Sequence, residues 1–186
     1  MKRLSLFVLL ICILCGCSGG QGDMDQAIAL RQKLLGASQC SFGADITADY
    51  GDKLCTFSMD CTADTDGTLH FTVTEPETLA GISGEMRQGE GKLVFADTGL
   101  AFPLMADGTL SPVSGPWVFL NTLRSGYLRS AGADGDFLQL TIDDSFRDDA
   151  LQLDIWVTEE GAPVRAEILL GGSRILSLTV RNFRIL

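Results

Sequence analysis

From Cys40 onward, apolar and polar residues alternate along several short segments of the chain. Side chains follow a period of two in β-strands, where successive residues point to opposite faces. In residues 40–49, for example, Phe42, Ala44 and Ile46 share one face. Further segments of this kind are residues 54–63, 68–75, 92–97, 100–105, 137–143, 151–160, 164–170 and 174–183. The pattern predicts about nine mostly antiparallel strands.

The first two strands predict a hairpin and, with it, a candidate disulfide. If Tyr50 and Gly51 form a two-residue loop, Cys40 lies opposite Cys61 and the apolar faces of the two strands coincide. Opposed Cβ atoms are about 4.5–5.5 Å apart, slightly wider than a disulfide favours. The alternative is a pair of buried free thiols, and a turn longer by two residues would remove the bridge. Cys55 would remain unpaired in either case.

Two other connections are visible in the sequence. Glu75-Pro76 ends the third strand, because proline cannot donate a ladder hydrogen bond. Gly171-Gly172-Ser173 predicts a three-residue hairpin loop between the last two strands. That loop would align Val164, Ala166 and Ile168 with Val180, Leu178 and Leu176.

Two segments have helical patterns instead. Asp23 and Gln26 match a capping box, and Gly36 ends the first pattern, so we expect a helix over residues 24–36. Its apolar positions are Met24, Ala27, Ile28, Leu34 and Leu35. In residues 114–126 proline stands where a helix begins and glycine where it ends, and residues 117–120 are all apolar. This second helix should be buried, with plain core packing as the simplest interpretation.

The N-terminus has the layout of a secretory leader. Lys2 and Arg3 precede an apolar run over residues 6–14, which is too short for a membrane span of roughly 20 residues. Residues 14–17, Leu-Cys-Gly-Cys, resemble the bacterial lipobox. That resemblance implies cleavage after residue 16 and a diacylglycerol, with further acyl chains such as palmitate, on Cys17.

The resulting organisation is a signal peptide (1–16), a lipid-anchored tether (17–23) and one domain (24–186). Acyl chains of this kind anchor a protein durably. The chain would then face the extracytoplasmic side of a bacterial cell membrane. The alternative is an ordinary secreted protein whose leader contains cysteines.

The charge of the chain excludes some partners. It carries 14 basic and 24 acidic residues, a formal net charge of −10, and removal of the two basic leader residues would leave −12. Such a surface is repelled by nucleic acid and by anionic phospholipid. We therefore expect no nucleic-acid partner, and membrane attachment that depends on the acyl chains.

Catalytic and metal chemistry find little support. His70 is the one histidine and falls on a threonine-rich strand face. The sequence has no Gly-x-Ser-x-Gly elbow whose serine this histidine could activate as a general base. Acidic clusters at residues 64–67, 134–136 and 143–149 invite a calcium interpretation but lack the spacing of a known loop, and Asp and Gly are common turn residues. We predict a non-enzymatic protein without catalytic residues, metal or cofactor.

The order of elements resembles the LolA and LolB lipoprotein carriers and related lipid-anchored proteins of Gram-positive bacteria. The resemblance rests on residues 69–84 (LHFTVTEPETLAGISG), 92–102 (KLVFADTGLAF), the mid-chain helix and residues 175–183 (ILSLTVRNF). It implies an α+β fold, a curved antiparallel half-barrel of about nine to eleven strands with an N-terminal and a mid-chain helix on its concave face. Carriers have an Arg-Pro pair at the turn where this chain has Glu75-Pro76, so a handover mechanism is not implied.

The family also implies a function. The half-barrel would bind an apolar ligand or a lipoprotein acyl chain in a cavity on its concave side. Candidate lining residues are Phe42, Ile46, Phe57, Met59, Phe71, Val73, Trp117, Leu120, Leu138, Trp156 and Leu178. The alternative, implied by lipoproteins of the GerS type, is a regulatory or scaffolding protein that binds a cell-envelope or spore-germination enzyme without carrying lipid.

Overall fold

The computed structural model describes residues 19–51, 53–95, 98–106, 108–147 and 149–186, so the predicted leader and Cys17 lie outside it. Its helical elements are α2 (Gly19–Gly36), η1 (Pro112–Ser114) and α3 (Gly115–Ser125). Its strands are β1 (Gln39–Asp49), β2 (Leu54–Asp64), β3 (Leu69–Glu75), β4 (Ser83–Arg87), β5 (Glu90–Phe95), β6 (Thr98–Pro103), β7 (Met105–Ala106), β8 (Thr109–Leu110), β9 (Tyr127–Asp134), β10 (Phe137–Asp143), β11 (Leu151–Val157), β12 (Pro163–Leu170) and β13 (Ser173–Ile185). No described helix combines the length and the apolar character that a membrane span needs.

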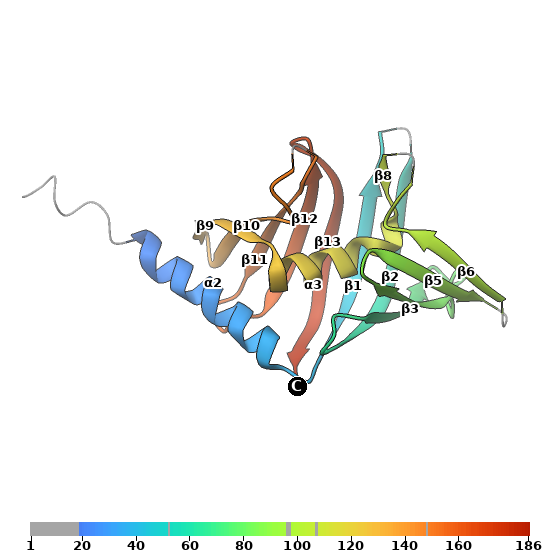
Figure 1. Ribbon diagram of the computed structural model, residues 1–186, viewed down its shortest axis with the longest axis horizontal. Coiled ribbons are helices and arrows are strands. Elements are labelled where there is room, and N and C mark those ends of the chain that lie inside the picture. Colours follow the sequence, from blue (N-terminus) through green and yellow to red (C-terminus); the bar gives the residue numbers. More distant parts are fainter. Residues whose placement is uncertain (1–18, 52, 96–97, 107, 148) are drawn as a thin grey trace, which may run out of the picture.

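One sheet of 11 strands dominates the molecule, in the order β6-β5-β4-β3-β2-β1-β13-β12-β11-β10-β9. Each neighbouring pair is antiparallel, and β1 joins the two halves by pairing with β13. The sheet curves around α3 and stays open, because β6 and β9 end it without pairing with each other (Figure 1). The predicted α+β half-barrel is confirmed.

The register of the first hairpin differs from the prediction. Asp49 pairs with Leu54, so Cys40 lies opposite Ala63 and Cys61 opposite Phe42. Cys40 and Cys61 are free cysteines, and the predicted disulfide is wrong. Tyr50 explains the longer turn, because its ring packs against the core and its hydroxyl donates a hydrogen bond to the Leu110 carbonyl.

The last hairpin follows the predicted alignment over most of its length. Ala166 pairs with Leu178 and Ile168 with Leu176, as expected. A register irregularity between Ile168 and Leu169 then shortens the loop, so that Leu170 pairs with Ser173 across Gly171-Gly172. A bulge of this kind inserts one residue into one strand and shifts the pairing beyond it.

The first helix is longer than predicted. It begins at Gly19, so Gly19–Asp23 are helical although we expected them in a tether. Only Ala27, Leu30 and Leu34 of this helix are buried, whereas Ile28 and Leu35 are exposed. Before Ala27 the helix is only partly covered, with Met24 half-buried and the Gln26 amide donating a hydrogen bond to the Glu159 carbonyl at 3.3 Å.

Candidate functional site

The concave face of the sheet gathers most of the residues that we expected to line a cavity. Those that are buried are Phe42, Ile46, Met59, Phe71, Val73, Leu120, Leu138 and Leu178, and the partly buried ones are Phe57 and Trp117. They join one hydrophobic cluster that includes the inner faces of α2 and α3. Ten of the eleven predicted residues thus lie on the inner surface, where they form packed core.

Aromatic rings fill the space beneath α3. Phe119 is 0% exposed, and its ring centroid lies 5.6 Å from that of Phe42 and 6.4 Å from that of Phe183. The gap between α2, α3 and the ends of β1 and β2, which Leu34 and Cys40 line, has no room for a water molecule. Among the described residues, therefore, no ligand-sized cavity lies at this place under the helix.

Helix α3 is also fastened to its surroundings by hydrogen bonds. Trp117 Nε1 donates to the Gly67 carbonyl at 3.2 Å. Arg124 donates to the carbonyls of Asp64 and Thr65 at 3.1 and 2.8 Å. These acceptors lie at the turn between β2 and β3. Residues from both ends of α3 therefore donate hydrogen bonds to the same turn.

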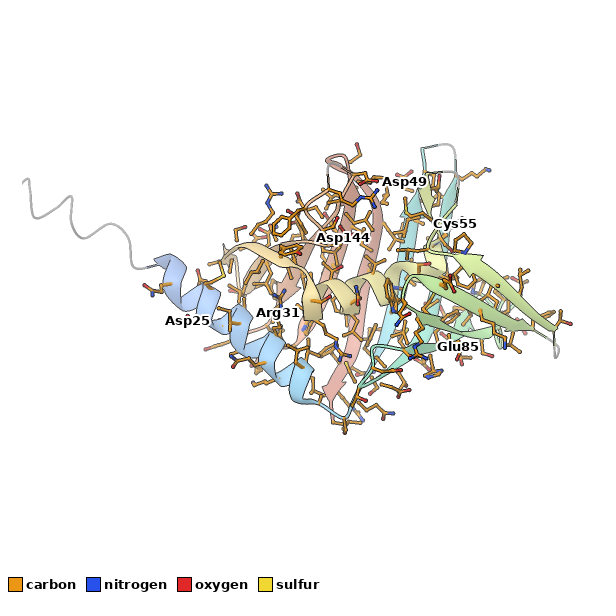
Figure 2. The ribbon with its side chains drawn as sticks, in the orientation of Figure 1. Asp25, Arg31, Asp49, Cys55, Glu85 and Asp144 are labelled. Atoms are coloured by element: carbon orange, nitrogen blue, oxygen red, sulfur yellow. The ribbon has the colours of Figure 1, made fainter. Side chains whose placement is uncertain are left out.

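Two further contacts restrict movement of α3. Arg31 lies between the two helices and donates to the Leu123 carbonyl at 2.9 Å (Figure 2). Burial lowers the pKa of Arg31 from its ordinary value. On the opposite side, a Cβ at Gly115 would lie 2.9 Å from a methyl of Leu176 in β13. Helix and sheet approach too closely there for a ligand between them.

Trp156 does not lie where we predicted. In β11 the alternate residues Leu153 and Ile155 face the core, which places Trp156 on the outer face. The Arg165 guanidinium covers its ring at 4.3 Å, and its indole nitrogen donates to Asp134 at 2.7 Å. These contacts bury the ring on the outer face, and the prediction failed because an uninterrupted apolar run hides the period of two.

The three thiols differ in their surroundings. Cys40 is buried, and this burial raises its pKa to about 12 although Arg124 acts in the opposite direction. Burial also raises the pKa of Cys61, with smaller contributions from Asp60 and Cys40. Cys55 is exposed. Thiolate chemistry is therefore suppressed at the two buried positions.

The outer face of β2 to β6 carries an open groove. One row of paired residues crosses it from strand to strand: Thr62, His70, Glu85, Lys92 and Ala101. Two adjoining depressions of about 390 and 990 Å³ meet at Glu85 and Lys92. We call these two depressions the outer groove; its outward-facing lining residues include Asp60, Thr62, His70, Thr72, Ser83, Glu85, Arg87, Glu90, Lys92, Val94, Gly99, Ala101 and Pro103.

Charges of both signs surround the groove. His70 Nε2 lies 3.1 Å from an Asp64 carboxylate oxygen, and its Nδ1 lies 4.0 Å from Glu85. Arg87 pairs with Asp66 at 3.5 Å. The backbone N–H of Thr68 donates to the Asp66 carboxylate and is the main cause that lowers the pKa of Asp66. His70 is exposed, as predicted, and no cluster of potential metal ligands was found in the described part of the chain.

Sequence reasoning missed this groove because it missed β4. Met86 is the only large apolar side chain of that strand, and the neighbouring inward position is Gly84. A Cβ at Gly84 would lie 2.6 Å from the Phe71 ring, so the aromatic residue takes the space that a second apolar side chain would occupy. An isolated Met between charged residues is too weak a signal to predict a strand.

Comparison with known proteins gives structural matches only. No family model and no curated protein match the sequence. The chain is similar in fold to LolA-superfamily proteins. A member from Nitrosomonas europaea is 8% identical, with 91% of this chain and 94% of that chain covered and a TM-score of 0.44.

Two further matches have comparable values. Lipoprotein LppX from Mycobacterium tuberculosis is 15% identical, with 87% of this chain and 93% of that chain covered and a TM-score of 0.43. A structure of the CwlD amidase from Clostridioides difficile in complex with the GerS lipoprotein matches at 13% identity over 91% of this chain and 98% of that chain, with a TM-score of 0.44. The function is therefore argued from this chain's own residues.

Proposed function

We propose that the chain is a non-enzymatic lipoprotein, acylated at Cys17 on the extracytoplasmic face of the membrane, which binds a protein of the cell envelope at its outer groove. The packing of the concave face beneath α3 is the observation that carries this proposal. A site for an apolar ligand requires a concave, mostly apolar space of roughly 300–1,000 Å³. The described residues beneath α3 pack against one another instead, and α3 is hydrogen-bonded in place.

The outer groove has the properties of a protein-binding surface. It is open to solvent, and its exposed charged residues include Glu85, Arg87 and Lys92. Threonine and histidine add hydrogen-bonding groups between these charges. At protein interfaces, positively and negatively charged side chains fix the orientation of the partner and exclude partners with the wrong charges. The same side chains disfavour the binding of an acyl chain. The groove therefore supports a polypeptide partner better than a lipid.

Photo-crosslinking in the host membrane tests the groove. A photoreactive amino acid at Thr72, inside the groove, should capture one dominant protein. The same residue at Thr179, exposed on the outer face of β13, serves as the matched control and should capture it weakly or not at all. Equal capture at both positions, or a scatter of abundant neighbours at Thr72, would contradict the proposal.

A charge variant sharpens the same experiment. Lys92→Glu reverses a charge in the groove and should reduce capture at Thr72 about tenfold. A partner that is complementary to Lys92 presents a negative charge there, and the new carboxylate would repel it. Lys53→Glu makes the same change of charge at an exposed position outside the groove. Capture that survives Lys92→Glu unchanged would exclude the groove as the binding site.

Mass spectrometry tests the remaining parts. Peptide mapping of the membrane-derived protein should find the acyl chains on Cys17, and Cys17→Ser should release the protein from the membrane. Native spectra should show no co-purifying lipid beyond these covalent chains. A stoichiometric bound lipid would instead support the carrier hypothesis.

A further inference from the structure

One edge of the sheet is uncovered. Strand β6 ends the sheet, and no described residue pairs with its outer side. Thr98, Gly99, Leu100 and Ala101 are all exposed. The opposite edge, β9, lies against α2 (Figure 1). An uncovered edge strand presents unpaired backbone groups on which another strand can add.

The register identifies the free backbone groups of β6. The Leu104 N–H donates to the Gly89 carbonyl at 2.9 Å, so these two residues form a hydrogen-bonded pair that continues the β5–β6 ladder. Hydrogen-bonded and non-hydrogen-bonded pairs alternate along an antiparallel ladder. The backbone groups of Gly99 and Ala101 therefore point away from β5, as does the carbonyl of Pro103.

We propose that β6 pairs antiparallel with β6 of a second copy of this chain, with Leu100 on the two-fold axis. In this register Gly99 of each copy lies opposite Ala101 of the other, and every free N–H of both residues meets a free carbonyl. A shift by one residue pair places Pro103 opposite Gly99, where the missing proline N–H leaves a carbonyl unpaired. A shift the other way places Ala101 opposite a position before the start of β6.

The side chains also suit two identical surfaces. Residues 98–103 contain no charged residue, although the chain as a whole carries a net charge of −10. The nearby strands β4 and β5 contribute a balanced set, namely Glu85, Arg87, Glu90 and Lys92. The residues of β6 itself therefore bring no carboxylates together across the axis. A two-fold interface requires such self-complementarity.

Apolar surface would be covered in the process. Leu100 is 63% exposed and Phe95, on the neighbouring strand and the same concave side, is 62% exposed. Leu100 of one copy would lie against Leu100 of the other, since non-hydrogen-bonded antiparallel pairs have Cα atoms about 4.5 Å apart. Gly99 and Ala101 also line the outer groove, so the grooves of both copies would join across the axis.

Cysteine crosslinking of the full chain in its host membrane tests this pairing. In a Cys55→Ser background, Leu100→Cys places two thiols across the axis at a spacing that a disulfide accepts. Mild oxidation should convert most of the protein to a covalent homodimer. Leu54→Cys, at a residue 68% exposed in β2, is the matched control and should remain monomeric. A monomeric Leu100→Cys protein, or one linked to a different protein, would overturn the proposal.

A second variant tests the backbone hydrogen bonds. Ala101→Pro removes the N–H that would pair across the axis, and proline is tolerated at an edge-strand position whose N–H faces outward. Combined with Leu100→Cys, it should reduce dimer formation at least about tenfold. A dimer yield unaffected by Ala101→Pro would exclude strand pairing. Failure of the dimer and failure of the proposed partner at the outer groove are distinguishable, because homodimer formation and capture at Thr72 are scored separately.

Discussion

Strands in the middle of the sheet and at its β6 edge contain the same alternation of apolar and polar residues, but their inward-facing side chains differ in burial. In β13, inward-facing Leu176 and Leu178 are each 1% exposed because helix α3 covers them. In β6, inward-facing Leu100 is 63% exposed because no helix reaches it (Figure 1). Equivalent positions in a strand thus become core or accessible surface depending on what lies above them.

The covered half should respond most strongly to loss of volume. Phe119→Ala removes a fully buried ring that packs edge-on against Phe42, and we expect a loss of about 3–5 kcal/mol in the free energy of unfolding. Urea denaturation measures it. Leu54→Ala, at a side chain 68% exposed, should change the same quantity by no more than about 0.5 kcal/mol. Comparable losses for both variants would contradict a packed interior.

In strands β4 to β6, which no helix covers, the position most sensitive to substitution is a glycine. A Cβ at Gly84 would clash with the Lys92 carbonyl oxygen, so Gly84→Ala forces β4 and β5 apart and should lower the free energy of unfolding by about 1–3 kcal/mol. Gly132→Ala is the control, since nothing lies within 4 Å of a Cβ there. Hydrogen exchange should show the loosening in β4 to β6 first, and equal effects of the two variants would argue against the close approach.

The hydrogen bonds that fasten α3 should give a smaller effect. Arg124→Met keeps the aliphatic stem but removes the donors to the Asp64 and Thr65 carbonyls, which should lower the free energy of unfolding by about 1–2 kcal/mol. Arg147→Met, at an exposed arginine whose ion pair among the described residues is with Asp149, should be nearly neutral. If Arg124→Met proved equally neutral, α3 would be held by packing alone.

The smallest expected effect is a pH dependence from the buried thiols. Burial raises the pKa of Cys40 from its ordinary value of 9.0 to about 12, so the unfolded chain releases this proton at lower pH than the folded chain. The contribution is fully present below pH 9 and declines as the pH rises toward 12. Denaturation at pH 8 and pH 10 should show this decline, and Cys40→Ala should reduce it.

In the native protein at pH 8, thiol labelling mapped by peptide mass should reach Cys55 but not Cys40 or Cys61.

Local patterns in the sequence were sufficient for the strands and helices that carry strong periodicity. Residues 40–49 and 54–63 became β1 and β2, and the predicted helix over residues 114–126 became α3 (Gly115–Ser125), because period, proline and glycine act within a few residues. Weak segments failed for the same reason. Strand β9 contains polar and small residues at a sheet edge, and β4 has a single large apolar side chain.

Everything that depended on distant contacts came from the tertiary structure. The ring of Tyr50 reaches the core and lengthens the first turn, which moved Cys40 away from Cys61. The pairing of β11 turned Trp156 outward. Alternation specifies which residues share a face but carries no information about what covers that face. Only the packing of α3 made the part of the concave side beneath it a closed core, and only the order of strands left β6 as a free edge.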